Sequence, residues 1–484
     1  MNVKRRASQL VGMLMGLLGG AVTMSSAMAF DILRTTGTIS PTAGGQVVPF
    51  PASCEFASLG SPLQLQEVVE RALCNNPKTR EAWANVKVQA AAVGVARAAW
   101  LPTVTGDWQG VRDDAVTNVT DHPELSSATR ATIKTESVSL NWTLYDFGAR
   151  SAAQENANAL LAAARATQDA TLQTIFIQVS KDFYAAQATA GALSTANDIE
   201  RMAYESQQAA QIRVDKGIAP ITDALAAQTE HEQAAVALVK ARGALQTALG
   251  TLASDMNQPP NVPIAMPAVD SGAQPDSAFT ESIDDLIASV RRSHPSVIAA
   301  QAQVDAAIAK SAQTRAEGWP TFSLVSKYSR NNQPASLGLG IPSHPATGHD
   351  WYVGFQLTIP FFDGFSRTYQ VRQADAQIER QQDVLDEARQ QAALDVWTAW
   401  QGLQTATDTA KRNTTLLDIA RRSFAAAQYR YREGVGNILE LLNAQRALAN
   451  AEQQRIQALT DWRAARLRLA GSLGQLHIAD AGGA

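Results

Sequence analysis

The feature that constrains this chain most is an internal repeat. Pro77 and Pro102 flank a helical stretch, and Pro295 and Pro320 flank a second one 218 positions later. A near-constant offset over separate landmarks indicates a tandem duplication, which decides the architecture before any local pattern does. Three further landmarks recur at an offset of 217: Tyr145–Asp146 as Phe362–Asp363, Arg213–Gly217 as Arg430–Gly434, and Ala227–Gln228 as Ala444–Gln445.

Each copy has the same predicted order of a helix, two strands, a long helix and a further helix. The long helices are predicted at 150–216 and 367–433, because neither range contains proline and both are rich in good helix formers. Small apolar residues recur with a period near seven, which is typical of helices packed along their whole length. Such a helix is about 100 Å long, far too long for a compact domain.

The strands show an alternation of apolar and polar residues. Leu140 and Trp142 in one copy, and Phe355 and Leu357 in the other, are separated by single polar or small residues. Strict alternation predicts a strand with one apolar face, and a run of about ten residues can cross a bilayer. We expect those four side chains to face lipid, with Asn141 and Gln356 facing a lumen. The alternative is a small sheet packed on a helical core.

Four strands per chain cannot close a barrel, and open sheet edges in lipid leave backbone groups unpaired. Several copies must therefore share one barrel. Eight strands would give a filled interior, whereas twelve would leave a lumen, so three chains are the smallest number that makes a pore. The predicted fold is mainly α with membrane β: a trimer with a 12-stranded outer-membrane β-barrel on a long α-helical barrel.

The first thirty residues predict export. A basic start is followed by an apolar stretch from Leu10 to Val22 and by the small residues Ala27 and Ala29, the pattern of a cleaved secretory signal. A membrane anchor is the alternative, but the stretch is short and broken by glycine. No cysteine stands at the cleavage point, so a lipid anchor is not expected. Cys54 and Cys74 could pair or remain thiols.

The predicted organisation has four parts. The first two are a signal peptide at 1–29 and a flexible extension at 30–64 that is rich in Pro, Gly, Thr and Ser. The first repeat, at 65–280, has strands at 103–112 and 136–145 and helices at 150–216 and 220–255. The second repeat, at 281–484, has strands at 320–329 and 351–360 and helices at 367–433 and 437–472. Polar loops are predicted between the paired strands, at Asp113–Lys134 and Arg330–Asp350.

The sequence lacks the residue patterns of the common enzyme classes. The six histidines are scattered, and His231-Glu232 does not begin a zinc-protease motif because Ala235 stands where the second histidine is required. No nucleophile elbow, P-loop or Cys-x-x-Cys motif is present. The formal net charge of −4 gives no basic field for nucleic acid. We therefore expect no enzyme activity, no cofactor, no metal site and no nucleic-acid partner.

The duplicated order of elements, the Leu101-Pro102 and Trp319-Pro320 strand starts and the two glycine motifs resemble the TolC family of outer-membrane factors. The resemblance covers roughly 65–473. It implies a homotrimer in the outer membrane with most of its mass in the periplasm. It also implies docking to a periplasmic adaptor protein and to an inner-membrane ABC or proton-driven transporter. A more particular resemblance is to the branch that exports an adenylate-cyclase toxin by type I secretion.

In that family the glycine motifs mark helical hairpins at the periplasmic tip. The resemblance assigns the tip and gate to Gly217, Thr222, Asp223, Tyr431 and Gly434. The resemblance assigns the channel aperture to Glu440 and to Asn443, the latter in place of a second acid. The departure is at Gly436, where the family has a basic residue.

Three functions remain open from the sequence. The first is an exit duct for a protein substrate, by type I secretion. The second is the outer-membrane component of a multidrug or metal efflux pump. The third is a periplasmic coiled-coil scaffold that transports nothing and would not need detergent to stay soluble.

Overall fold

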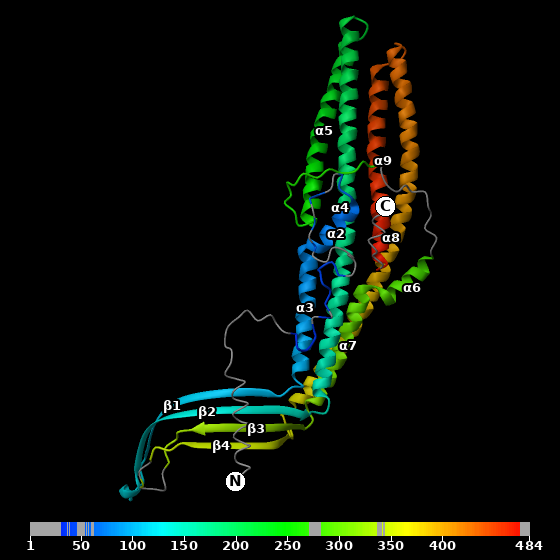
Figure 1. The fold of residues 1–484 in the computed structure, drawn as a ribbon. Coiled ribbons are helices and arrows are strands. Elements are labelled where there is room, and N and C mark those ends of the chain that lie inside the picture. The colour runs from blue at the N-terminus through cyan, green and yellow to red at the C-terminus, as the bar shows by residue number, and fades with distance from the viewer. Residues whose placement is uncertain are drawn as a thin grey trace.

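The computed structural model describes residues 31–35, 37, 39–45, 54, 56, 58–59, 62–270, 282–335, 341 and 344–474. A four-stranded sheet forms one end of the molecule and a rod of long helices extends from it (Figure 1). The first repeat contains α2 (Leu65–Asn75), α3 (Pro77–Ala98), β1 (Thr103–Thr117), η2 (Pro123–Leu125), β2 (Ser127–Tyr145), α4 (Ala149–Asp215) and α5 (Ile221–Asp255). The second contains α6 (Ile283–Ser293), α7 (Pro295–Ala316), β3 (Thr321–Asn331), β4 (Gly348–Thr358), α8 (Ser366–Arg432) and α9 (Ile438–Ser472).

The duplication is visible in the helix lengths. Corresponding helices of the two repeats have 11, 22, 67 and 35 residues in both copies. Their starts repeat as well: the side chain of Asn76 caps α3 and that of His294 caps α7, each followed by proline at the first helical position. Proline is favoured there because its missing N–H would have no helical partner. The two copies thus use the same local chemistry to begin the same helix.

The strands form one antiparallel sheet in the order β1-β2-β3-β4. The β2–β3 pairing joins the two repeats, with Trp142 opposite Leu324 and, one strand on, Leu324 opposite Phe355. Because directly opposite residues share a face, the large apolar side chains of three strands lie on one side. Gln356 and Ser323 share the other side. In the described part of the chain β1 and β4 pair on one side only, so both outer edges are open.

The first hairpin corrects a sequence prediction. The loop expected at Asp113–Lys134 is mostly strand, because β1 continues to Thr117 and β2 begins at Ser127. Asp114 and Arg130 are paired in register there and form an ion pair at 2.6 Å. This stretch contains several Thr residues, which favour strands, but it is polar on both faces and so gave no alternation to read. The second hairpin has shorter strands.

The second strand of each hairpin, β2 or β4, turns into a long helix through an arginine corner. At the first corner Asp146 accepts from the backbone N–H of Arg150 at 3.0 Å, and the Arg150 side chain donates to the Thr143 carbonyl at 2.6 Å. At the second, Asp363 accepts from the backbone N–H of Arg367 at 2.9 Å. The guanidinium of Arg367 donates to two carbonyls at the end of α7. The first corner thus joins the end of β2 to the start of α4, and the second joins the start of α8 to the end of α7.

The rod has a string of apolar clusters instead of one central core. One cluster lies around α2 and the middle of α4, another around α6, α8 and α9, and smaller ones lie toward the two ends. Helix α4 packs against α3, α5, α7 and α9 and so links the repeats. This is the lengthwise packing that the sevenfold spacing indicated.

The N-terminal extension is a second correction. The predicted signal peptide lies outside the described residues. The extension was expected to be flexible, yet its described residues pack along α3 and α4 and reach a disulfide between Cys54 and Cys74. The Pro, Gly and Ser content reflects a chain held through backbone carbonyls, with few side chains buried.

Among the described residues, no helix combines the length and apolar character needed to cross a membrane.

Candidate gate at the helical tip

Each repeat ends its long helix in a glycine turn, at the end of the rod far from the sheet (Figure 1). Gly217 follows α4 with a φ of +70°, and Gly434 follows α8 with a φ of +78°. Only glycine adopts such left-handed angles without steric penalty. Ile218 N then donates to the Arg213 carbonyl at 2.9 Å, which caps the end of α4. The turns reverse the chain into α5 and α9.

Gly436 follows the second turn, where the TolC family has a basic residue. Its N–H donates to the Arg430 carbonyl at 3.0 Å. A β-carbon at this position would lie 3.1 Å from the backbone of Arg430 and Tyr431, closer than an ordinary contact. Any side chain at position 436 would therefore crowd the end of α8.

A contact between the two repeats lies beside these turns. The guanidinium of Arg213, from α4, lies over the Tyr431 ring with 4.8 Å to its centre, and Nη1 donates to the Tyr431 carbonyl at 2.8 Å. Tyr431 is buried against Ala227, Ile438 and their neighbours. We call the Arg213–Tyr431 pair the tip contact.

Charges around the ring act on the Tyr431 hydroxyl. Burial raises the pKa of Tyr431, the positive charge of Arg213 lowers it, and the negative charge of Asp223 raises it. The net direction is upward, so the phenol stays neutral at physiological pH. Among the candidate tip residues, Asp223 thus acts on Tyr431 through its charge, while Thr222 is exposed on the first turn of α5.

The two aperture candidates lie on the first turns of α9. The side chain of Asn437 caps this helix by accepting from the Glu440 backbone N–H at 2.8 Å. The Glu440 carboxylate lies 3.5 Å from the Arg430 guanidinium, and both side chains are about half exposed. Asn443 is exposed one turn further on. Neither side chain is buried in the chain.

Sequence reasoning missed three polar groups of the two hairpins. Arg213 and Arg430 occupy equivalent positions in the repeat motif, a signal that could have singled them out. The third is an ion pair between the buried Glu230 of α5 and Arg446 of α9, with 2.7 Å from Nε to Oε2. No spacing in the sequence points to it, because its partners are 216 residues apart.

Comparison with known proteins adds independent information. A model of the family described as outer membrane efflux protein matches residues 68–258 and 286–475, one segment in each repeat. The chain is 30% identical over 423 residues to Protein CyaE of Bordetella pertussis strain Tohama I, covering 86% of this chain and 84% of that protein. It is 24% identical over 408 residues to the outer membrane efflux protein BepC of Brucella suis biovar 1, covering 84% of each.

Solved structures agree on the fold. A structure of CusC matches with a TM-score of 0.72 at 18% identity, covering 85% of this chain and 92% of that one.

Proposed function

The chain belongs to the outer membrane efflux protein family, and from that premise we propose that three copies form one exit duct through the outer membrane. Proteins of this family are outer-membrane channels with the TolC-like fold. In the proposed trimer the three sheets close a 12-stranded barrel, and the helical rods form a tube that holds most of the mass in the periplasm.

The pair of open sheet edges is the observation that supports the proposed trimer. Unpaired backbone groups facing lipid cost several kcal/mol each, roughly. The same sheet bears an exposed apolar face that includes Phe355 and Leu357, 68% and 58% exposed in the single chain. Lipid covers that face in the proposal, and β1 of one copy pairs with β4 of the next. The α-helical rod of 67 residues supplies a tube of about 100 Å.

We assign the gate of this duct to the tip. Gly217 and Gly434 form the hairpin turns, the tip contact holds the repeats together, and Thr222 and Asp223 flank it. Glu440 from three copies would form a ring of carboxylates at the narrow end, with Asn443 one turn above. Such a ring attracts cations and repels anions.

The exported substrate is, in this proposal, a protein handed over by type I secretion. The support is the resemblance to the toxin-exporting branch and the identity to Protein CyaE, which exceeds that to BepC. The partners are a periplasmic adaptor and an inner-membrane ABC or proton-driven transporter. Efflux of small molecules or metals is the second candidate, supported by the family's description.

The trimer is tested by native mass measurement in detergent, followed by conductance in planar bilayers. A three-fold mass and stepwise ion conductance are expected. A stable monomer or dimer, or a trimer that never conducts, would contradict the duct.

Secretion and efflux are separated by deleting the gene in the organism that carries it. Loss of one or more proteins from the culture medium, with unchanged sensitivity to toxic compounds and metals, supports secretion. The reverse result supports efflux.

A further inference from the structure

The described residues between Asp31 and Leu63, which we call the N-terminal strap, lie on the rod in a defined direction. Arg97 near the end of α3 donates to the Leu33 carbonyl at 2.7 Å, and Trp83 donates to the Ser40 carbonyl at 3.0 Å. The Leu33 contact lies near the end of α3 and the Ser40 contact lies closer to its start, so the strap runs antiparallel to α3.

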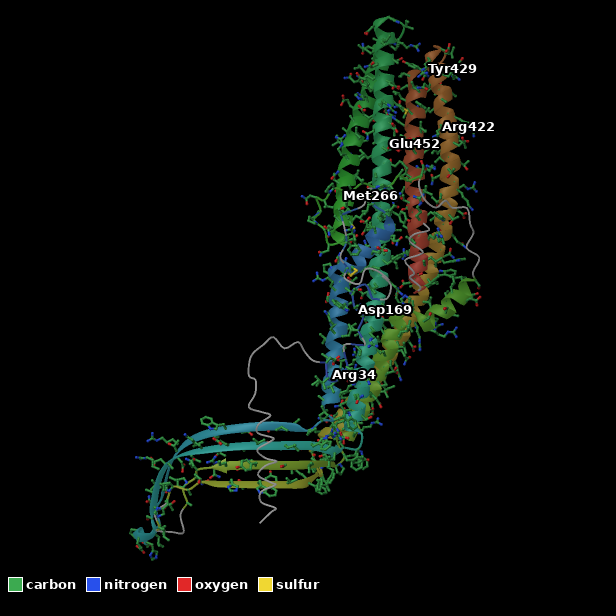
Figure 2. The ribbon with its side chains drawn as sticks, in the orientation of Figure 1. Arg34, Asp169, Met266, Arg422, Tyr429 and Glu452 are labelled. Atoms are coloured by element: carbon green, nitrogen blue, oxygen red, sulfur yellow. A yellow bond between two sulfur atoms is a disulfide. The ribbon has the colours of Figure 1, made fainter. Side chains whose placement is uncertain are left out.

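The strap starts at the sheet end of the rod. Arg34 lies beside the lower part of the rod in Figure 2, close to where α3 leads into β1. Further on, Gln168 of α4 donates to the Ala43 carbonyl at 3.1 Å, and Ile39 packs on the apolar cluster between α3 and α4. These contacts are single hydrogen bonds to backbone carbonyls, each weak in isolation.

The far end of the strap completes the core around α2. Arg71 is 6% exposed, and its guanidinium lies 5.1 Å from the centre of the Phe56 ring and donates to the Ser58 carbonyl at 3.2 Å. Leu63 is fully buried, and its N–H donates to the Ala265 carbonyl at 2.9 Å. Glu67 of α2 also accepts from the Arg71 guanidinium, at 2.7 Å, so the charge is paired within the helix and the strap adds a carbonyl and a ring contact. Cys54, Phe56 and Leu63 pack this end of the strap against the core around α2.

One covalent bond joins this end of the strap to the rod, the disulfide between Cys54 and Cys74. Cys74 lies in the last turn of α2 and is 3% exposed. We propose that Cys54 and Cys74 are substrates of a thiol–disulfide oxidoreductase in the compartment to which the chain is exported, and that their disulfide locks the strap onto the rod. The proposal needs export, which family membership supports, but it needs neither the trimer nor a particular cargo.

The chemistry balances by thiol–disulfide exchange. The thiolate of one cysteine attacks the disulfide of the oxidoreductase, forms a mixed disulfide and releases one oxidoreductase thiolate. The thiolate of the other cysteine then attacks the first cysteine's sulfur and displaces the second oxidoreductase thiolate. Two electrons pass to the oxidoreductase, whose two sulfurs take up the two protons. Closing the loop between Cys54 and Cys74 removes conformations from the detached strap and so favours the seated one.

The test uses the full-length chain purified from membranes in detergent, either untreated or reduced with dithiothreitol and alkylated. Arg34 is the single Lys or Arg in 31–63, so trypsin cleavage there reports on the start of the strap. Chymotrypsin cleavage after Phe56 reports on its disulfide-bonded end. Reduction should raise the initial cleavage rate at Phe56 on the order of 100-fold and also raise it at Arg34, since an engaged loop of this size is substantially stabilised. Cleavage after Lys216, in the distant hairpin turn, should be unchanged.

Two variants sharpen the result. The double variant Cys54→Ser/Cys74→Ser should be cut like the reduced protein and should not respond to dithiothreitol. Arg97→Gln should expose Arg34 but leave Phe56 protected while the disulfide is intact. If the double variant fails to fold, reduction of the assembled wild-type protein still decides the question.

Unchanged cleavage at both sites after reduction, with alkylation of both cysteines verified by mass, would overturn the lock. Two free thiols in the untreated protein would overturn the oxidation step. A trimer that still conducts while its strap is open would leave the proposed function intact and support the lock as a separate property.

Discussion

Arg213 and Tyr431, from opposite repeats, are joined twice: by a hydrogen bond of 2.8 Å to the Tyr431 carbonyl and by the stacking of the guanidinium over the ring. The equivalent arginine of the second repeat, Arg430, instead lies next to Glu440 of its own hairpin. Equivalent residues of the two repeats therefore make different contacts. One joins the two hairpins, and the other neutralises a carboxylate inside one hairpin.

The first prediction concerns the tip contact. Arg213→Ala removes a charged hydrogen bond and a cation–π contact, together about 2 kcal/mol, so the open tip should gain on the order of 30-fold in population. Single-channel recordings should show longer or more frequent open states. Arg201→Ala, which removes an exposed ion pair on the same helix, serves as the control and should leave gating unchanged. Equal open times in wild type and Arg213→Ala would contradict a role in closure.

The second prediction concerns the arginine corners. Arg150→Lys loses the fork that reaches the Thr143 and Leu144 carbonyls, and we expect a loss of about 2–3 kcal/mol in unfolding free energy. Arg367→Lys should cost less, about 1 kcal/mol, because that side chain is more exposed. Denaturant unfolding in detergent measures both, with the exposed Arg412→Lys as control. Equal losses in all three variants would rule out a special role for the corners.

The third prediction concerns the sheet faces. Leu357 is paired with Phe322 on the apolar face, and Gln356 lies next to it on the other face with Ser323. Leu357→Arg should reduce assembly in the membrane, because a charge on the lipid side near mid-membrane costs about 2–4 kcal/mol. Gln356→Arg should cost little. The yield of trimer in outer-membrane fractions measures both, and equal losses of yield in the two variants would mean that the face assignment is wrong.

The fourth prediction concerns pH. Burial, and then the hydrogen bond and charge of Asp182, raise the pKa of Asp255 to about 7. The unfolded carboxyl titrates near 4, roughly. Between these values the folded chain holds a proton that the unfolded chain has lost, so the contribution of Asp255 to stability is fully present below pH 4 and is lost as pH rises through 7.

Asp255→Asn stays neutral at every pH and should remove this fall. Allowing for solvent screening at a half-buried site, we expect it to stabilise the protein at pH 8 by about 1–2 kcal/mol and to change little at pH 4. Denaturant unfolding at the two pH values checks this, with the exposed Glu205→Gln as control. A larger gain at pH 4 than at pH 8 would show that the sign is wrong.

The sequence predicts the architecture because each copy of the duplication contains local signals. Proline-free runs predicted the long helices, and Gly217 and Gly434 predicted the turns, since each signal acts on its own neighbourhood. The contacts that finish the tip are not local. Arg213 contacts Tyr431, which lies 218 positions further along the chain, and no pattern around either residue predicts this contact.

Two misses have a different physical origin. The strap is bound through its backbone carbonyls by Arg97, Trp83 and Gln168, so its own side chains show no apolar periodicity. The distal half of the first hairpin is held by ladder hydrogen bonds and the Asp114–Arg130 pair, with polar residues on both faces. Backbone bonding of this kind leaves little trace in a hydrophobicity pattern.

The last prediction concerns the proposed carboxylate ring. Three copies of Glu440 near the axis would favour cations, but each carboxylate lies 3.5 Å from the Arg430 guanidinium, which offsets part of its charge. Glu440→Ala should therefore weaken cation preference and block by multivalent cations, whereas Arg430→Gln should strengthen both. Asn443→Ala should change neither, although Asn443 lies on the same face one turn on. Reversal potentials across a salt gradient in planar bilayers measure the preference. The alternative is that Glu440 merely stabilises the start of α9, where acids are favoured. That alternative predicts unchanged selectivity in both Glu440→Ala and Arg430→Gln, so opposite shifts in the two variants would exclude it.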